Sequence, residues 1–180
     1  MHGVLEVVLP LYPGVFVCAR PRTQPRDIGH AVSLLIEKGL DAKSQMFLAQ
    51  ADVEKHYDSI RALLVIEWCI QRGLPSCVAA AIIRHQLFTC LSVQVGNVEV
   101  FVKQRCIGTL TGSRIAGALG RVPVEATLRA IAPRVRRQCF RFQNVALMGA
   151  SFVDNVYFLA RDLSSAHANA ALFEQHLHDH

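Results

Sequence analysis

The sequence of 180 residues predicts a single α+β domain, and three observations lead to this prediction. Hydrophobic residues make up 52% of the chain, which is enough for a buried core and too many for a disordered protein. Apolar residues recur at helical spacing in some stretches and form short strand-like runs in others. These stretches alternate along the chain, without an internal repeat or a linker that would mark a second domain.

The first third of the chain predicts a strand, a basic loop and a helix. The strand covers 15–19, and the loop covers 20–26 with two prolines. The helix begins near Asp27 and ends at Gly39, a residue typical of a helix C-terminus. Its apolar face is formed by Ile28, Ala31, Val32, Leu35 and Ile36.

The middle third predicts a buried strand, two helices and a hairpin. The apolar run 46–52 ends in a carboxylate and indicates the buried strand. A helix over 60–71 would be capped by Ser59, and Pro75 would open the next helix, which runs to about residue 90. The hairpin strands are expected at 91–95 and 98–102, around Gly96-Asn97.

The last third predicts a loop, a long helix, a strand pair and a final helix. A loop over 107–113 leads into a helix over about 113–139, which Pro123 would kink or split. Its apolar stripe is Ile115, Leu119, Val122, Ala126, Ile131 and Val135. Strands follow at 145–150 and 156–160, around a turn at 152–155. The final helix begins near Ser164 or Ser165, and one face carries Ala166, Ala170, Phe173 and Leu177.

Basic residues are concentrated in one part of the chain. Residues 103–141 hold nine Lys and Arg against a single acid, Glu125, so that this stretch has a net charge of +8 and the rest of the chain −3. Such a stretch favours a phosphate-bearing partner, although an arginine-rich face exposed only to solvent has the same composition.

The cysteine and histidine patterns favour structural roles. None of the six cysteines forms a CxxC, so we expect reduced and mostly buried thiols in an intracellular protein, and core or helix-packing positions for Cys69, Cys77 and Cys90. The N-terminus does not resemble a signal peptide, and no membrane association is expected. The sequence does not distinguish the nucleus from the cytoplasm. The C-terminal histidines, at 176, 178 and 180, fit a helix end better than a metal site.

Two aspartates stand at the ends of apolar strand-like runs. Asp52 follows the first run, and Asp154 lies in the turn between the last two expected strands. A carboxylate at the end of a buried strand is costly unless it is paired or metal-bound. Two on neighbouring strands would suit Mg²⁺, which takes few carboxylates and keeps water and phosphate oxygens as its other ligands. Each aspartate taken alone also fits a turn or helix cap.

The residues around these aspartates resemble a known family. ADVEKHYDSI at 51–60 resembles the first palm motif of reverse transcriptases from non-LTR-type retroelements, or retrotransposons. SFVDN at 151–155 resembles the aromatic-x-Asp-Asp turn of that family, and IGTLTGSRIAGALGR at 107–121 stands where its second, glycine-rich motif belongs. The likeness covers about residues 45–162. In the turn, Asn155 replaces the second Asp, and the second motif lacks the usual Pro-Gln-Gly.

The resemblance implies a role for each group of matched residues. Asp52 and Asp154 would be catalytic and would bind Mg²⁺ or Mn²⁺, with the Val53 carbonyl and Asn155 as further ligands. The nucleotide-binding residues would be Tyr57, Gly112, Ser113 and Arg114. The nucleic-acid-binding residues would be Arg20, Arg22, Arg105, Arg121, Arg134, Arg136 and Arg137.

The fold implied by the resemblance is a polymerase palm-like antiparallel sheet packed on one side by helices, with a ferredoxin-like or RNA-recognition-like core. Residues 1–44 would be a partial fingers-like region, 45–162 the palm and 163–180 a C-terminal helix, with most of the fingers and thumb missing. The single chain would then be a divergent, truncated reverse transcriptase-like domain.

The implied reaction is two-metal nucleotidyl transfer, which extends a DNA primer on an RNA template with deoxynucleoside triphosphates. The substitution at Asn155 favours an alternative, a non-enzymatic nucleic-acid-binding relic of the same domain. A third hypothesis is an unrelated helical interaction domain whose motif matches are accidental. Both polymerase-derived hypotheses require Asp52 and Asp154 to lie close together.

Overall fold

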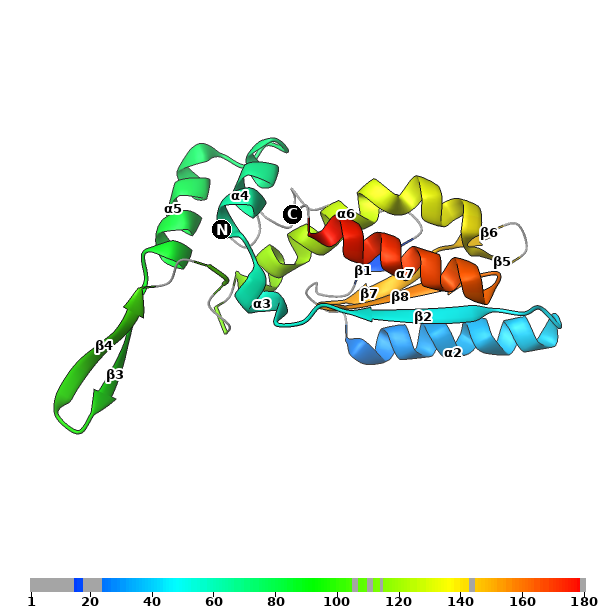
Figure 1. Ribbon diagram of the computed structural model, residues 1–180, viewed down its shortest axis with the longest axis horizontal. Helices are drawn as coiled ribbons and strands as arrows, with labels where there is room; N and C mark the ends of the chain where they lie inside the picture. The colour runs from blue at the N-terminus through cyan, green and yellow to red at the C-terminus, as the bar shows by residue number, and fades with distance from the viewer. Residues whose placement is uncertain are drawn as a thin grey trace. The chain divides into compact units, whose positions relative to one another are not determined.

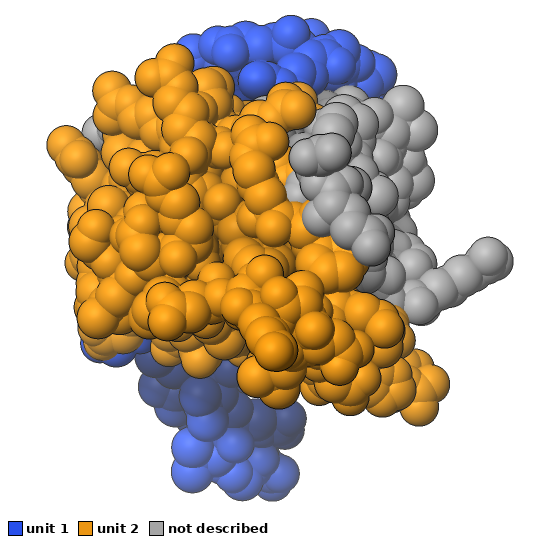
Figure 2. Space-filling view, turned by 90° about the vertical axis from the view of Figure 1, so that its right-hand side faces the viewer, with its two compact units in different colours: residues 1–10, 55–120 blue, residues 11–54, 121–180 orange. Residues whose placement is uncertain are grey.

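The computed structural model describes residues 15–17, 24–104, 107–109, 112–113, 115–142 and 145–178. The chain is α+β, as predicted, and forms two compact units that Figure 2 colours separately. Unit 1 contains residues 55–120, and unit 2 is built from 11–54 and 121–180. In the sequence, residues 55–120 of unit 1 therefore stand between the two parts of unit 2.

Unit 2 contains a four-stranded sheet with the strand order β1-β7-β8-β2. The strands are β1 (Val15–Val17), β2 (Phe47–Asp52), β7 (Gly149–Phe152) and β8 (Asn155–Ala160). β8 is antiparallel to both of its neighbours, whereas β1 is parallel to β7. The prediction of an antiparallel sheet is therefore wrong at β1, where the long stretch of chain between the two strands permits parallel pairing.

Helices cover both faces of this sheet. On one face, residues of α6 (Ala116–Gln138) and α7 (Leu163–Leu177) form the main core with β8, which includes Leu128, Val156 and Phe173. On the other face lies α2 (Pro25–Asp41), where Ile28 packs on Ala150. The prediction of helices on one side only is therefore wrong, because α2 also has an apolar face to bury.

The strand β2 is an edge strand and not the buried strand that its apolar sequence suggests. Its residues alternate between half-buried and exposed, and the half-buried Ala49 and Ala51 pack against the core. Asp52 is on the exposed face, so its carboxylate is solvated and does not carry the burial cost expected for it.

The predicted strand over 145–150 is divided at Met148. Its first part, β6 (Val145–Leu147), pairs with β5 (Phe140–Phe142) in a separate ribbon. The second part becomes β7, which pairs with β1 and β8. The predicted strand is divided because β5 pairs with its first part, whereas β1 and β8 pair with its second part.

Unit 1 contains three helices, a hairpin and the first residues of α6. The elements are α3 (His56–Ser59), α4 (Ala62–Ile70), α5 (Ser76–Leu87), β3 (Cys90–Val95) and β4 (Val98–Gln104). The hairpin turns at Gly96, with a positive φ of 61°, as its Gly-Asn dipeptide predicts. Ser59 does not cap α4; its hydroxyl donates to the His56 carbonyl at 3.0 Å, and Arg61 is the N-cap residue.

The long helix α6 is continuous from Ala116 to Gln138 through both Pro123 and Pro133, so it is not split at Pro123. Every residue of its predicted apolar stripe is buried. On α2, the predicted face is only partly correct, since Ala31 and Ile36 are exposed.

The cysteines divide into two classes. Cys69 and Cys139 are buried, and burial raises the pKa of the Cys69 thiol to about 11. Cys77 and Cys90 are exposed, so the prediction of core or helix-packing positions is wrong for these two. Among the helices of the described residues, none has the length and apolarity needed to cross a membrane.

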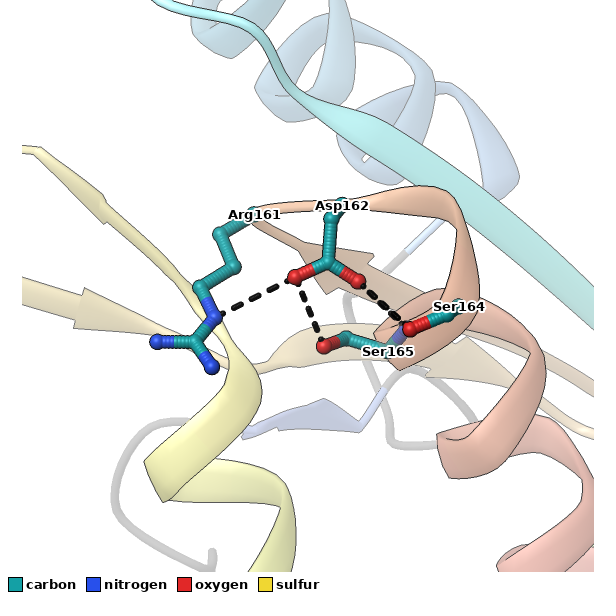
Figure 3. A network of polar contacts seen from close by, with 4 residues as sticks. All are labelled: Arg161, Asp162, Ser164 and Ser165. Atoms are coloured by element: carbon teal, nitrogen blue, oxygen red, sulfur yellow. Dashed lines mark hydrogen bonds and ion pairs between the residues drawn. The ribbon is translucent and has the colours of Figure 1, made fainter.

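Asp162 caps α7 and makes the helix start sensitive to pH. Its carboxylate accepts hydrogen bonds from the Ser165 N–H at 2.7 Å and from the hydroxyls of Ser164 and Ser165, and it pairs with Arg161 at 3.2 Å (Figure 3). The hydrogen bonds from Ser165, led by its backbone N–H, lower the pKa of Asp162 below its ordinary value of 3.8.

Replacing Asp162 with Ala is therefore expected to lower the Tm at neutral pH, because α7 loses its N-cap. Since the folded-state pKa is depressed, the stabilisation is present above the ordinary carboxyl pKa and disappears as the pH falls through the folded value. Thermal unfolding followed by circular dichroism should show the Tm gap closing in acid. Asp162→Asn, which keeps a capping oxygen, is the control; an Ala gap independent of pH would contradict the assignment.

Candidate functional site

The two aspartates singled out from the sequence lie next to each other in unit 2. In the register of β2 and β8, Asp52 is opposite Asn155, and the Val53 N–H donates to the Asp154 carbonyl at 3.0 Å. The start of the first motif, at 51–53, and the end of the last, at 154–155, therefore meet at one end of the sheet, where β2 ends and the β7–β8 turn begins. The proximity that both polymerase-derived hypotheses require is present.

The turn that carries Asp154 is tight and strained. Phe152 and Asn155 are paired, so only Val153 and Asp154 connect β7 to β8. Val153 has a φ of 54°, a conformation that β-branched residues rarely adopt. Such strain costs about 1–3 kcal/mol and is concentrated at functional sites, because the surrounding structure must hold it in place.

A chain of hydrogen bonds crosses the site from β2 to the turn. The Gln50 amide donates to the Asn155 side-chain oxygen at 2.7 Å, and the Asn155 amide donates to the Asp154 carboxylate at 3.1 Å. The Asn155 oxygen is thus already engaged by Gln50, which argues against the predicted role of Asn155 as a metal ligand. Gln50 was not predicted; its place two residues before Asp52, on the same strand face, is the signal in the sequence.

The Asp52 carboxylate is available to a ligand. Across the described structure it forms no hydrogen bond or ion pair, and it borders an open groove of about 380 Å³ between β2 and α7. The α7 side of this groove includes His167 and Glu174. A second groove, of about 500 Å³, lies on the α2 side of the sheet and is lined in part by Phe152, Asn155 and Tyr157.

In unit 1, the loop after Gly108 is held against the first motif by backbone contacts. The Thr109 N–H donates to the Tyr57 carbonyl at 2.7 Å, and the Gly108 N–H donates to the Ile60 carbonyl at 2.9 Å. Gly108 has a φ of 83°, and a Cβ there would lie 2.8 Å from the Tyr57 carbonyl oxygen. Only glycine fits this position.

The start of α6 packs against the same motif. A Cβ on Gly120 would lie 3.0 Å from both the His56 and the Tyr57 rings, so the helix approaches these side chains closely. His56 is buried and meets the half-buried Tyr57 edge to face, with ring centroids 5.3 Å apart. The sequence assigned no role to His56; here it supports the Tyr57 ring.

The other predicted nucleotide-binding residues are only partly described. Gly112 has a φ of 87° and is exposed. The Ser113 hydroxyl accepts a hydrogen bond from the Ile115 N–H at 3.4 Å, just before α6 begins. Arg114 lies outside the described residues.

The predicted nucleic-acid-binding arginines do not form one group. Arg134, Arg136 and Arg137 are exposed at the end of α6. Arg121 is only 1% exposed, so the prediction that it contacts nucleic acid is wrong; it falls on the buried side of the helix. The remaining three, Arg20, Arg22 and Arg105, lie outside the described residues.

The carboxylate site brings together two acids, Asp52 and Asp154. Within the described ranges, no three His, Cys, Asp or Glu side chains gather as a metal-binding group. A scan against protein-family models found no match for the chain, and no curated protein matches it.

Proposed function

We propose that the chain is a reverse transcriptase-like palm domain that carries out two-metal nucleotidyl transfer. The observation that carries this proposal is that Asp52, at the end of β2, lies beside the Val153-Asp154 turn in the pairing of β2 with β8. The two segments are more than 100 residues apart in the sequence. Accidental motif matches would have no reason to lie on neighbouring strands, or to be joined by a strained two-residue turn.

The fold of unit 2 supports the same proposal. In a palm, the catalytic acids lie at one end of a sheet, and helices cover one face of that sheet. In this chain, the acids lie at the ends of β2 and of the β7–β8 turn, and α6 and α7 pack on the core face of the sheet. The helix α2 on the other face and the parallel β1 are additions to the antiparallel core of β7, β8 and β2.

The donor set fits a hard divalent cation. Asp52 and Asp154 supply carboxylate oxygens, and the Asp52 carboxylate has no partner within the described part of the chain. The Val53 backbone is fixed beside them by its bond to Asp154. Mg²⁺ or Mn²⁺ bound here would supply Lewis acidity for phosphoryl transfer and neutralise phosphate charge.

The residues of the chain would position the reactants. Asp52 and Asp154 would hold the cations. In unit 1, the resemblance assigns Tyr57, whose ring packs against His56, to binding of the incoming deoxynucleotide, and it assigns the same role to Gly112, Ser113 and Arg114. An RNA template and a DNA primer are the polymeric substrates that the resemblance implies.

Primer extension tests the proposal directly. The purified chain is incubated with a DNA primer on an RNA template, deoxynucleoside triphosphates and Mg²⁺ or Mn²⁺. Extension that stops on chelation is expected, and an Asp41→Asn variant should be as active, because that exposed carboxylate pairs with Lys38 on α2 and not at the site. Lack of extension under every metal condition would overturn the catalytic proposal.

The geometry of Asn155 favours one alternative function. Its amide N–H groups face Asp154, where a second aspartate would offer oxygen to a cation. A non-enzymatic nucleic-acid-binding relic would tolerate this arrangement. Salt-sensitive nucleic-acid binding without any extension would identify the relic.

A further inference from the structure

Basic side chains gather at the end of unit 2 that is opposite the carboxylates. The end of α6, the β5–β6 ribbon and the start of α7 lie together there (Figure 1). The backbone confirms this placement, because Cys139 bridges to Ala160 and the Arg161 N–H donates to the Gln138 carbonyl at 3.4 Å. We call this surface the basic end; it consists of Arg134, Arg136, Arg137, Arg141 and Arg161, all exposed.

The basic end is well separated from the aspartates. In the pairing of β2 with β8, Phe47 is opposite Ala160, and Asp52 is opposite Asn155. Five residue steps at about 3.4 Å each place the two ends of this strand pair about 17 Å apart. At the ionic strength of a cell, the Debye length is about 8 Å, so the two ends act as electrostatically independent surfaces.

The arginines of the basic end are not used to hold the fold together. Among the described residues, Arg134, Arg136, Arg137 and Arg141 form no ion pair, and only Arg161 has one, with Asp162. Burial raises the pKa of the nearby Cys139 thiol, and the positive charges of Arg141 and Arg136 act in the opposite direction. By contrast, Arg129 on the same helix is committed to the buried Glu125 at 3.1 Å.

We infer that the basic end binds the phosphate backbone of nucleic acid without divalent cations. The choice of nucleic acid as the polyanion rests on the proposed function. The chemistry rests on the surface itself, because arginine guanidinium groups bind phosphate in a bidentate manner and five exposed arginines share this end against one paired carboxylate, Asp162. Without a bound cation, the negative charges of Asp52 and Asp154 repel a phosphate backbone. Binding in the absence of metal is therefore expected at the basic end.

The test measures binding of a fluorescein-labelled single-stranded oligonucleotide by anisotropy, in EDTA and at several salt concentrations. The variant is Arg136→Gln with Arg137→Gln. Loss of two phosphate contacts is expected to weaken binding about tenfold near physiological salt, and to reduce the slope of log K against log salt by about 1.4.

A matched control removes the same charge elsewhere. Arg61→Gln with Arg84→Gln changes two exposed arginines of unit 1 and should leave the affinity unchanged. The inference would be overturned if no binding remained in EDTA, or if both double variants lost the same affinity for the oligonucleotide. A preference for anionic lipid vesicles over the oligonucleotide would also overturn it. Failure of primer extension alone would leave it intact, because Asp52→Asn should bind the oligonucleotide in EDTA as the wild type does.

Discussion

Replacing Asp154 with asparagine is expected to slow primer extension about 10³-fold, the loss that follows when several kcal/mol of metal-mediated stabilisation is removed. The substitution keeps the size of the side chain and an oxygen that can accept the hydrogen bond from Asn155. It removes the negative charge of one of the two aspartates proposed to hold the cations. The measurement is the single-turnover extension rate with Mg²⁺, together with the Mn²⁺ affinity from calorimetry.

The fold should survive this change, so circular dichroism and Tm serve as the first control. The second is Asp41→Asn, which removes an exposed carboxylate at the other end of α2 and β2. An Asp154→Asn variant that extends primers at the wild-type rate would show that the β7–β8 turn does not bind the catalytic metal.

Replacing Gly149 with alanine is expected to destabilise the chain by about 3–5 kcal/mol, which is the range of the most damaging single substitutions. A Cβ at this position would lie 1.9 Å from the Tyr157 carbonyl oxygen; the backbone of residue 149 fixes the Cβ, and the oxygen is a backbone atom that cannot rotate away. Because β7 pairs with β8 here and with β1 on its other side, the clash must open the sheet. Urea unfolding measures the loss.

Gly29 provides the matched control for this substitution. It lies on α2, also in unit 2, and a Cβ there would meet no atom within 4 Å. Gly29→Ala is expected to be neutral or to stabilise the helix by about 0.5–1 kcal/mol. If both alanine variants unfold at the same urea concentration as the wild type, β7 and β8 do not approach each other at Gly149 as closely as described.

Local patterns in the sequence predicted most of the elements. The stripe on α6 could be predicted because a period of 3.6 depends only on the helix itself, and every one of its residues is buried. The hairpin could be predicted at Gly96 because its turn needs a residue of positive φ. The helical period and the turn residue each lie within one local element, so they can be recognised without knowing which distant parts of the chain pack against them.

Features that depend on distant partners could not be predicted in this way. The apolar residues of β2 do not show that the strand lies at a sheet edge, since that depends on how many strands pair with it. The division at Met148 follows from competition among β5, β1 and β8 for the same run. The orientation of Asn155 depends on Gln50, which is 105 residues away in the sequence.

The same separation affects how the molecule is made. Among the described strands, β2 pairs only with β8, so it stays without a strand partner while residues 55–154 are synthesised. Contacts of such long range slow folding, and an open apolar strand is prone to associate with other chains. The carboxylate site is therefore assembled among the last parts of the chain, and conditions that delay synthesis of residues 145–160 should raise the fraction of aggregated protein.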